Sequence, residues 1–228
     1  MLLCPWDDLP ENMRTPEVRP YYDILAKKKA SLVFKRLFDI VFSILLLLFL
    51  WPLFLVLAIA IKLESKGPVF YRQTRVTQFG KLFKIHKFRS MCDGADKKGS
   101  LVTVGNDMRV TRVGKIIRKC RLDEISQLLD VLEGTMTFVG TRPEVPKYVA
   151  GYTPEMMATL LLPAGVTSTA SINYKDEATL LDASSDVDKT YIQEILPAKM
   201  KWNLEDIEKY SFLGDIAVMF KTLFAVLG

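Results

Sequence analysis

The amino-acid sequence predicts a mostly α-helical protein with a few short β-strands and one helix that enters a membrane. Three observations predict this fold class. No charged residue occurs between Ile40 and Ile61, residues 112–132 and 203–227 repeat apolar side chains at helical spacing, and residues 69–76 and 81–91 alternate as strands do. The chain has 228 residues, half of them apolar, which is enough for one compact domain beside the membrane helix.

The first segment, residues 1–34, is predicted to be an extended arm followed by a short helix that ends at three consecutive lysines, residues 27–29. The formal net charge of +5 and the pI near 9.0 fit an anionic membrane surface or an anionic substrate. The segment is charged and interrupted by prolines, so no cleavable signal peptide is expected. Three widely spaced cysteines and one histidine argue against a disulfide framework and a zinc site, and they suit a reducing compartment.

The second segment, residues 35–64, is the predicted membrane element, because about 20 apolar residues cross a bilayer as a helix. Pro52 lies inside the apolar run, where it removes a hydrogen bond and bends or breaks a helix. Basic residues flank the run on both sides, whereas a spanning helix keeps its positive charge on one side. Two arrangements remain open at this point: a kinked span, or a re-entrant helix that breaks at Pro52 and returns to the same face.

Residues 65–200 are predicted to form the compact domain, and residues 201–228 a C-terminal amphipathic helix. The domain would contain strands at 69–76 and 81–91, a loop at 92–108, and one helix from Arg112 to Leu132 with Gly134 as its cap. Short helices are expected at 175–181 and 187–196. Asp215 and Lys221 argue against a second span, so the last helix is expected to lie in the interface or on the domain.

The strongest candidate site is Asp123 with Glu124, which follows Arg118 and Arg121 on the predicted helix. Arginines neutralise phosphates and lower the pKa of a neighbouring carboxylate. An aspartate that stays ionised can attack phosphorus, as in aspartyl-phosphate enzymes. The competing interpretation is a solvated charged helix face with ion pairs along the helix.

Three further patterns qualify as site or anchor residues. Lys87 and Arg89 place two cations on one face of a strand, which suits a diphosphate or an ordinary edge strand. Arg142, held between stiff neighbours after a strand that ends at Gly140, suits an anion clamp or a surface turn. Asp39 follows Arg36 at the entrance of the apolar run and is expected to anchor the start of the helix; His86 receives no role.

Taken in order, these motifs resemble those of the bacterial sugar transferases, the monotopic phosphoglycosyl transferases that begin glycan assembly on a lipid carrier. The resemblance covers roughly residues 35–170, and it depends on the number and order of the motifs. The matching motifs are Lys35-Arg36-Leu37-Phe38-Asp39-Ile40, Gly67-Pro68-Val69-Phe70-Tyr71-Arg72-Gln73, Lys87-Phe88-Arg89-Ser90-Met91, Leu122-Asp123-Glu124, Gln127-Leu128 and Val139-Gly140-Thr141-Arg142-Pro143-Glu144.

The resemblance implies a re-entrant helix–break–helix and a small catalytic domain with interfacial helices on the cytoplasmic face of the inner membrane. It implies that Asp123 attacks a UDP-sugar, releases UMP and passes a covalent phosphosugar to a polyprenyl phosphate. Glu124 would assist as acid, base or metal support, with Mg²⁺ held by Asp123 and Glu124. The resemblance further implies membrane lipid as a partner and leaves a homodimer open. The residues that match phosphate-binding or loop positions are Lys87, Arg89, Arg118, Thr141, Arg142, Pro143 and Glu144.

The sequence departs from the family pattern at several positions, none of which removes a candidate charged group. Ser126 stands where proline often follows the Asp-Glu pair, and Thr141 replaces the first proline of a Pro-Arg-Pro element. The chain lacks the N-terminal multi-span region of longer relatives and is expected to be a minimal catalytic form. A membrane-anchored scaffold without catalytic activity is the alternative, and nucleic-acid binding is not expected because no such motif occurs. Which sugar is transferred and which glycan is built do not follow from the sequence.

Overall fold

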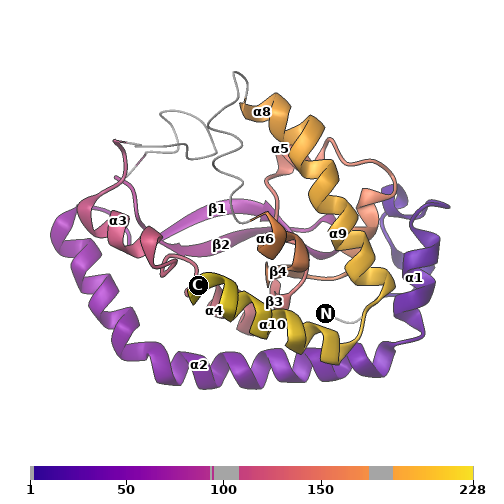
Figure 1. Ribbon diagram of the computed structural model, residues 1–228, viewed down its shortest axis with the longest axis horizontal. Coiled ribbons are helices and arrows are strands. Elements are labelled where there is room, and N and C mark those ends of the chain that lie inside the picture. The colour runs from indigo at the N-terminus through magenta and orange to yellow at the C-terminus, as the bar shows by residue number, and fades with distance from the viewer. Residues whose placement is uncertain (1–2, 93, 95–107, 175–186, 228) are drawn as a thin grey trace.

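The computed structural model is mostly helical with four short strands in the part of the chain that it describes, residues 3–92, 94, 108–174 and 187–227 (Figure 1). This confirms the predicted mostly helical content with a few short strands. The helices are α1 (Arg19–Ala26), α2 (Lys29–Glu64), α3 (Arg112–Lys119), α4 (Gln127–Glu133), α5 (Pro146–Val149), α6 (Thr169–Asn173), α8 (Val187–Thr190), α9 (Leu196–Glu208) and α10 (Phe212–Leu227). The strands are β1 (Phe70–Val76), β2 (Leu82–Phe88), β3 (Met136–Val139) and β4 (Ala164–Thr167).

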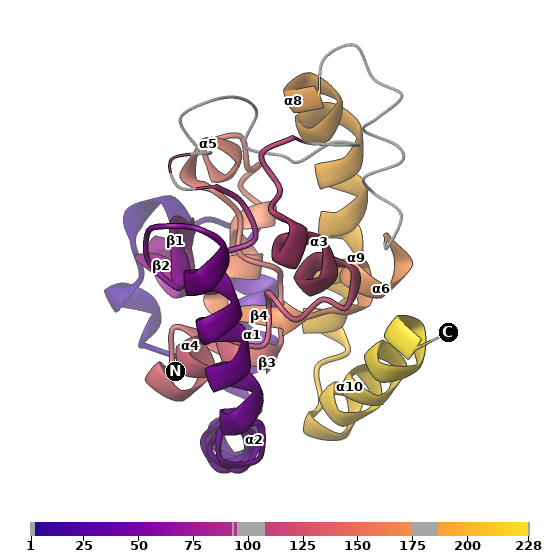
Figure 2. The same cartoon turned by 90° about the vertical axis from the view of Figure 1, so that its left-hand side faces the viewer.

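The long helix α2 is continuous through Pro52, so the helix is bent rather than broken there. Figures 1 and 2 show one arm of α2 running beneath the domain and a second arm rising beside α3. The packing partners change at the same place: residues 38–50 contact the cluster around Phe138, whereas residues 53–61 contact Phe88 and Ile117. A proline inside a helix removes one hydrogen bond and bends the axis, which explains the position of the change.

The outer surface of α2 is apolar and open. It is the one helix, among the described residues, that is long and apolar enough to cross a membrane, and only 11% of its most apolar window is buried. Phe49 is 79% exposed and Leu63 is 83% exposed. Water does not favour such a surface, whereas lipid does, so α2 is suited to a membrane.

Two charged side chains of the first arm of α2 attach it to β3 and α4. Asp39 accepts hydrogen bonds from the Thr137 hydroxyl at 2.8 Å and the Phe138 amide at 3.3 Å, both in β3. Arg36 donates to the carbonyls of Val131 at 2.6 Å and Leu132 at 2.9 Å, at the end of α4. Carbonyls at a helix C-terminus lack partners within the helix, so a guanidinium is a natural cap. Arg36 and Asp39 therefore hold the helix against the domain.

The strands form two separate pairs. β1 and β2 are antiparallel, with Phe70 opposite Phe88, and they match the two strands predicted at 69–76 and 81–91. β3 and β4 are parallel, and the two backbones approach so closely beyond them that a Cβ atom on Gly165 would lie 2.1 Å from the Gly140 carbonyl oxygen. Gly140 and Gly165 thus place the chain after β3 directly against β4.

Two predicted helices are each split in the structure. The helix expected from Arg112 to Leu132 ends at Lys119 and resumes at Gln127, because Arg121 adopts the left-handed conformation with φ of 52°. The helix expected at 203–227 is divided at residues 209–211 into α9 and α10, and α9 begins earlier, at Leu196. The helix expected at 187–196 appears as α8 and a π-helical turn, Tyr191–Ile195. The helix expected at 175–181 and most of the loop at 92–108 lie outside the described residues.

The N-terminal arm is part of the core. It forms two 3₁₀ turns, Trp6–Asp8 and Glu11–Met13, before the short helix α1. Met13, Val18 and Leu25 are fully buried in a cluster that includes side chains of residues 157–162 and of α9. The predicted short helix is confirmed, whereas the arm is folded onto the domain rather than extended from it.

Candidate active site

Asp123 and Glu124 lie in the turn between α3 and α4, beside the end of β2. The Asp123 carbonyl oxygen accepts a hydrogen bond from the Phe88 amide at 3.0 Å, which ties the turn to the strand. The Ser126 hydroxyl, which is buried, lies 3.0 Å from the His86 carbonyl oxygen and 3.2 Å from that of Asp123. Ser126 therefore bridges the turn and the strand, where the family pattern often has a proline. The two carboxylates stand in a fixed turn and not on the helix face that the sequence predicted.

Glu124 is held by two cations that come from distant parts of the chain. Lys87 of β2 donates to one Glu124 carboxylate oxygen at 2.9 Å. Arg142, from the loop after β3, contacts both oxygens; its Nη1 lies 3.3 Å from Oε2, and its Nη2 pairs closely with Oε1. Burial by itself raises the pKa of Glu124, but Arg142 and Lys87 outweigh it and hold this pKa well below the ordinary value. Glu124 is thus ionised and rigid at neutral pH.

The Asp123 carboxyl group behaves in the opposite way. Its pKa is raised above the ordinary value, first by burial and also by the neighbouring Glu124 charge, while Lys87 and Arg118 act to lower it. The sequence led us to expect a lowered pKa, and that expectation is wrong because burial and the Glu124 charge together outweigh the lowering of this pKa by Lys87 and Arg118. A partly desolvated carboxylate with a raised pKa is a more basic and hence more reactive nucleophile, provided that it is ionised.

Among the other predicted cations, Arg118 lies near Asp123 and Arg89 does not. Arg118 is half-exposed in the last turn of α3 and acts on the Asp123 charge. Arg89 is only 5% exposed and donates to the carbonyls of Ser65 at 2.7 Å and Lys66 at 2.8 Å, just beyond the end of α2. Since β2 ends at Phe88, the strand alternation that would pair Lys87 with Arg89 does not apply.

We expect Arg89→Met to lower the stability of the fold by about 1–3 kcal/mol, because it removes the charged donor that binds the Ser65 and Lys66 carbonyl oxygens. The KM for a nucleotide sugar should stay within about twofold of that of the unchanged protein. Thermal unfolding in detergent and steady-state kinetics measure the two quantities. A large rise in KM with no loss of stability would instead show that Arg89 contributes to phosphate binding.

The three other residues predicted in the loop after β3, Thr141, Pro143 and Glu144, contact different parts of the domain. The Thr141 carbonyl oxygen accepts from the Gly165 amide at 2.8 Å, and the Pro143 carbonyl oxygen accepts from Arg75 at 2.9 Å. Glu144 is buried and turned away from Asp123. Its carboxylate lies 3.9 Å from Arg75 and 3.8 Å from Lys199, and it accepts a hydrogen bond from the Tyr191 hydroxyl; these contacts make it a brace.

Two further groups were not predicted from the sequence. Arg75, Tyr191 and Lys199 surround Glu144, and of these only Arg75 stands close to a matching motif, two residues after Gln73. His86 and Asp130 join β2 to α4, with Nδ1 of the histidine 2.8 Å from Oδ1 of the aspartate. No local pattern indicates such pairs, because their members are far apart in the chain.

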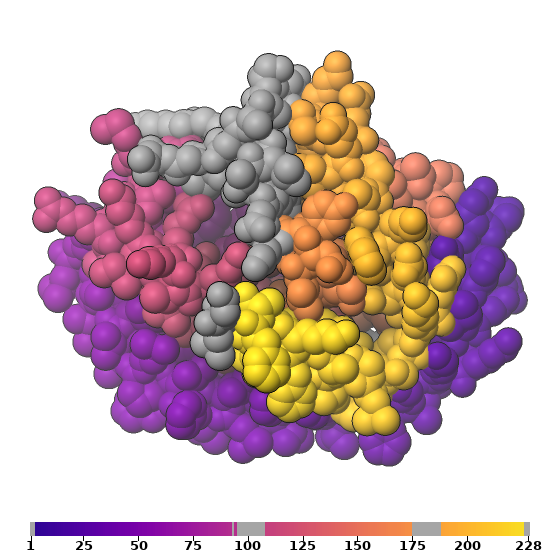
Figure 3. All heavy atoms as spheres, viewed as in Figure 1, coloured from indigo at the N-terminus to yellow at the C-terminus, as the bar shows by residue number. Residues whose placement is uncertain are grey.

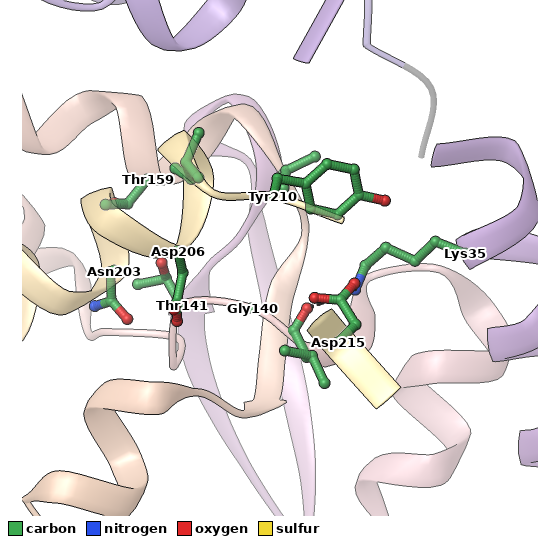
Figure 4. Close-up of a pocket in the computed structure, with 11 residues that line it drawn as sticks. Lys35, Gly140, Thr141, Thr159, Asn203, Asp206, Tyr210 and Asp215 are labelled. Carbon is green, nitrogen blue, oxygen red and sulfur yellow. Dashed lines mark hydrogen bonds and ion pairs between the residues drawn. The ribbon is translucent and has the colours of Figure 1, made fainter. Parts of the chain in front are cut away.

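Behind the loop lies a small, partly open pocket of about 30 Å³ between α2, the loop and α9 (Figure 4). Lys35 closes one side, with its Nζ 2.8 Å from the Val139 carbonyl oxygen and 2.5 Å from Asp215 of α10. On the other side the buried Asn203 side-chain oxygen, which has no hydrogen-bond partner among the described residues, turns towards Thr141 and Asp206. The volume suits one water molecule, so this pocket supports the loop and is too small for a sugar nucleotide.

Comparison with known proteins places these features in a family. The sequence model of the bacterial sugar transferase family matches residues 30–228 of the chain. The UDP-N-acetylgalactosamine-undecaprenyl-phosphate N-acetylgalactosaminephosphotransferase of Aeromonas hydrophila is 35% identical over 196 residues, 85% of this chain and 43% of that protein. The UDP-glucose:undecaprenyl-phosphate glucose-1-phosphate transferase of Escherichia coli K12 is 35% identical over 218 residues, 94% of this chain and 44% of that protein.

A third relative is the exopolysaccharide production protein PSS of Rhizobium leguminosarum, 50% identical over 113 residues, 49% of this chain and 56% of that protein. The chain spans less than half the length of the Aeromonas and Escherichia relatives. The matched region nevertheless contains α2, the Asp123–Glu124 turn and the loop that carries Arg142. The chain belongs to the bacterial sugar transferase family.

Proposed function

We propose that the protein is a phosphoglycosyl transferase that moves a sugar-1-phosphate from a UDP-sugar to a polyprenyl phosphate and releases UMP. The observation that carries the proposal is the pairing of two unlike carboxylates in one turn. Glu124 is held by Lys87 and Arg142, whereas the carboxylate of the more basic Asp123 makes no hydrogen bond to another residue in the described part of the chain. Pathways that build exopolysaccharides or other glycoconjugates on a lipid carrier begin with this reaction.

The first half of the reaction follows from this arrangement. An oxygen of Asp123 attacks the phosphorus that carries the sugar, so that an aspartyl phosphate bond forms and the bond to the bridging oxygen of UMP breaks. Arg118 and Arg142 line the turn and neutralise charge on the phosphates, because guanidinium groups bind phosphate oxygens in a fixed geometry. Glu124 holds Arg142 and Lys87 in place. In the second half, the phosphate oxygen of the polyprenyl phosphate attacks the same phosphorus and releases Asp123.

The donor atoms of the turn fit a magnesium ion. Mg²⁺ prefers a few carboxylate oxygens together with substrate phosphates, and the Asp123 carboxylate is not engaged by another described side chain. Glu124 is less available, because Lys87 and Arg142 already bind its oxygens. When bound, the ion would neutralise the diphosphate; Asp123 would be its first protein ligand, and Glu124 would support it from the neighbouring position.

The direct test is to incubate the purified protein with Mg²⁺ and a panel of labelled UDP-sugars in the absence of lipid acceptor. UMP release with a phosphosugar adduct on Asp123, found by mass spectrometry, is the expected result, and it also identifies the sugar. Sugar-dependent UMP release that requires polyprenyl phosphate and leaves no adduct would contradict the covalent intermediate. A protein that supports its pathway in cells after loss of Asp123 would be a scaffold.

The pH dependence of UMP release follows from the raised pKa of Asp123. Because the ionised carboxylate is the reactive form, the rate should fall as the pH drops through this pKa, which lies above the ordinary value of about 3.9. Lys87 favours the ionised form, so Lys87→Gln should raise the pKa further and move the fall in rate to higher pH. Lys84→Gln, an exposed lysine on the same strand, is the matched control and should not move the profile. If the pH profile of UMP release is unchanged in Lys87→Gln, Lys87 does not influence the pKa of Asp123.

We further propose that α2 is re-entrant, so that both of its ends and the domain lie on the cytoplasmic face of the inner membrane. The bend at Pro52, the basic residues at both ends and the side-chain bonds from the first arm to β3 and α4 support this arrangement. Single cysteines at position 11 (Glu11→Cys) and at the native Cys120, with the other cysteines replaced by serine, test it. A membrane-impermeant maleimide should reach both from the cytoplasmic side only; labelling from opposite sides would establish a span.

A further inference from the structure

Helix α3 presents an exposed basic stripe at the end of the membrane helix. Between Arg109 and Leu122 the sequence contains six lysines and arginines and no carboxylate. At 100° per residue, Lys115, Lys119, Arg112 and Ile116 fall in one arc about 100° wide. All four side chains are exposed, Ile116 to 63%, and the three cations form no ion pair within the described part of the chain.

The opposite face of α3 is fixed to the protein. Ile117 is 1% exposed and packs with Leu57, Ile61 and Phe88, so it faces the second arm of α2. Gly114 lies so close to the chain after β2 that an added Cβ would meet the Ser90 carbonyl oxygen at 1.9 Å. The basic stripe is therefore held in one orientation, and Figure 3 shows α3 at the outer edge of the molecule.

The position of α3 along α2 sets its height relative to a bilayer. Glu64, the last residue of α2, accepts hydrogen bonds from the first two amides of α3, Arg112 at 2.7 Å and Val113 at 3.0 Å. The charge-free run ends at Ile61, three residues earlier, which is about 4.5 Å along a helix. The polar layer of a bilayer is roughly 5–7 Å thick on each side. If α2 is embedded as proposed, the first turn of α3 lies at the level of the lipid headgroups.

We propose that Arg112, Lys115 and Lys119 bind the phosphates of anionic phospholipids, with Ile116 inserted beside α2. The inference rests on the proposed membrane function, which it extends by naming the lipid class and the residues. The bound lipid holds α3, and with it the Asp123 turn four residues beyond Lys119, at a constant depth. Substrate is a poorer occupant of the stripe, because Arg118, the cation of this helix that acts on Asp123, projects about 100° away from Lys119.

The test measures lipid binding by the full chain in neutral detergent. Cys4 and Cys92 are replaced by serine, a dye is attached to the exposed Cys120 at the end of α3, and energy transfer to acyl-labelled phosphatidylglycerol or phosphatidylcholine is titrated. Each cation at a membrane surface contributes about fivefold in affinity, so phosphatidylglycerol should bind on the order of 100-fold more tightly. Arg112→Gln/Lys115→Gln/Lys119→Gln should abolish the preference, whereas the control Lys81→Gln/Lys84→Gln/Lys201→Gln, which removes the same charge elsewhere, should keep it.

Equal binding of the two lipids, or an equal loss of preference in the control, would overturn the proposal. A rise in KM for the UDP-sugar in the α3 variant, with the lipid preference unchanged, would overturn it in favour of substrate. UMP release is measured on the same samples so that the two proposals separate. If UMP is released but the protein does not prefer phosphatidylglycerol, only the lipid-site proposal is refuted. If the protein prefers phosphatidylglycerol but releases no UMP, only the proposed reaction is refuted.

Discussion

Asp123→Asn is expected to abolish UMP release, with a loss on the order of 10⁴-fold or more, and to leave the protein folded. The amide keeps the shape of the side chain but has no ionised oxygen to attack phosphorus. Losses of this size are typical when a covalent nucleophile is removed. The turn should survive the change, because it is held by the backbone of Asp123 and the hydroxyl of Ser126 rather than by the Asp123 carboxylate.

The matched control is Glu133→Gln, which neutralises an exposed carboxylate one helix away and should keep full activity. Thermal unfolding and the release of UMP from the UDP-sugar that gives an adduct are measured on both variants. Residual activity above about 1% of that of the unchanged protein, free of amide hydrolysis back to aspartate, would remove Asp123 from the role of nucleophile. Loss of activity together with loss of folding would assign Asp123 to the structure of the turn instead.

Much of the site could be predicted because its motifs are local. Each charged residue of the site stands in a short recognisable motif: Asp123 and Glu124, Lys87 of β2, and Arg142 after β3. The structure brings these residues together around one turn. What local reasoning missed was the conformation of that turn. The helical pattern of apolar residues continues from Ile117 to Leu128, yet the left-handed Arg121 interrupts the helix between them. The apolar residues keep their helical spacing across this interruption, so the periodicity of the sequence does not reveal it.

Two of the residues expected at the phosphate site have partners that lie far along the chain. Arg89 and Glu144 read as ligands for phosphate because both stand in motifs rich in charge. Arg89 instead caps residues 65 and 66, and Glu144 braces Arg75 and Lys199 across the domain. A charged side chain inside a small domain must be paired, so the density of charge in a motif does not distinguish a binding group from a brace.

The form of α2 was open in the sequence for a related reason. An apolar run with a central proline predicts a distorted helix but not the size or direction of the bend. Those are set by contacts that periodicity does not contain: the bonds of Arg36 and Asp39 to the domain on one arm, and the packing of Phe54, Leu57 and Ile61 on the other. Each arm is held by its own contacts with the domain, and the helix bends at Pro52 because the two arms point in different directions.

Arg142→Ala is expected to raise the KM for the UDP-sugar by roughly 10- to 150-fold and to leave membrane association unchanged. A hydrogen bond to a charged group contributes about 1.5–3 kcal/mol, and each 1.4 kcal/mol is a factor of ten. The Arg142 side chain is one-third exposed beside Glu124, so part of its guanidinium remains accessible to a phosphate. Arg14→Ala, which removes an exposed arginine of the arm, should change neither quantity.

A double-mutant cycle with Glu124→Gln separates two roles of Arg142. If Arg142 served only to neutralise Glu124, its removal would have no effect once Glu124 is an amide. If Arg142 also binds the diphosphate, Arg142→Ala still raises KM in the Glu124→Gln background, and the difference between the two backgrounds measures the coupling of the pair. We expect the second result, because the Arg142 side chain is one-third exposed, so a phosphate can reach part of its guanidinium whichever side chain stands at position 124. Full additivity would show that Glu124 does not position Arg142, and the pair would then act on the substrate independently.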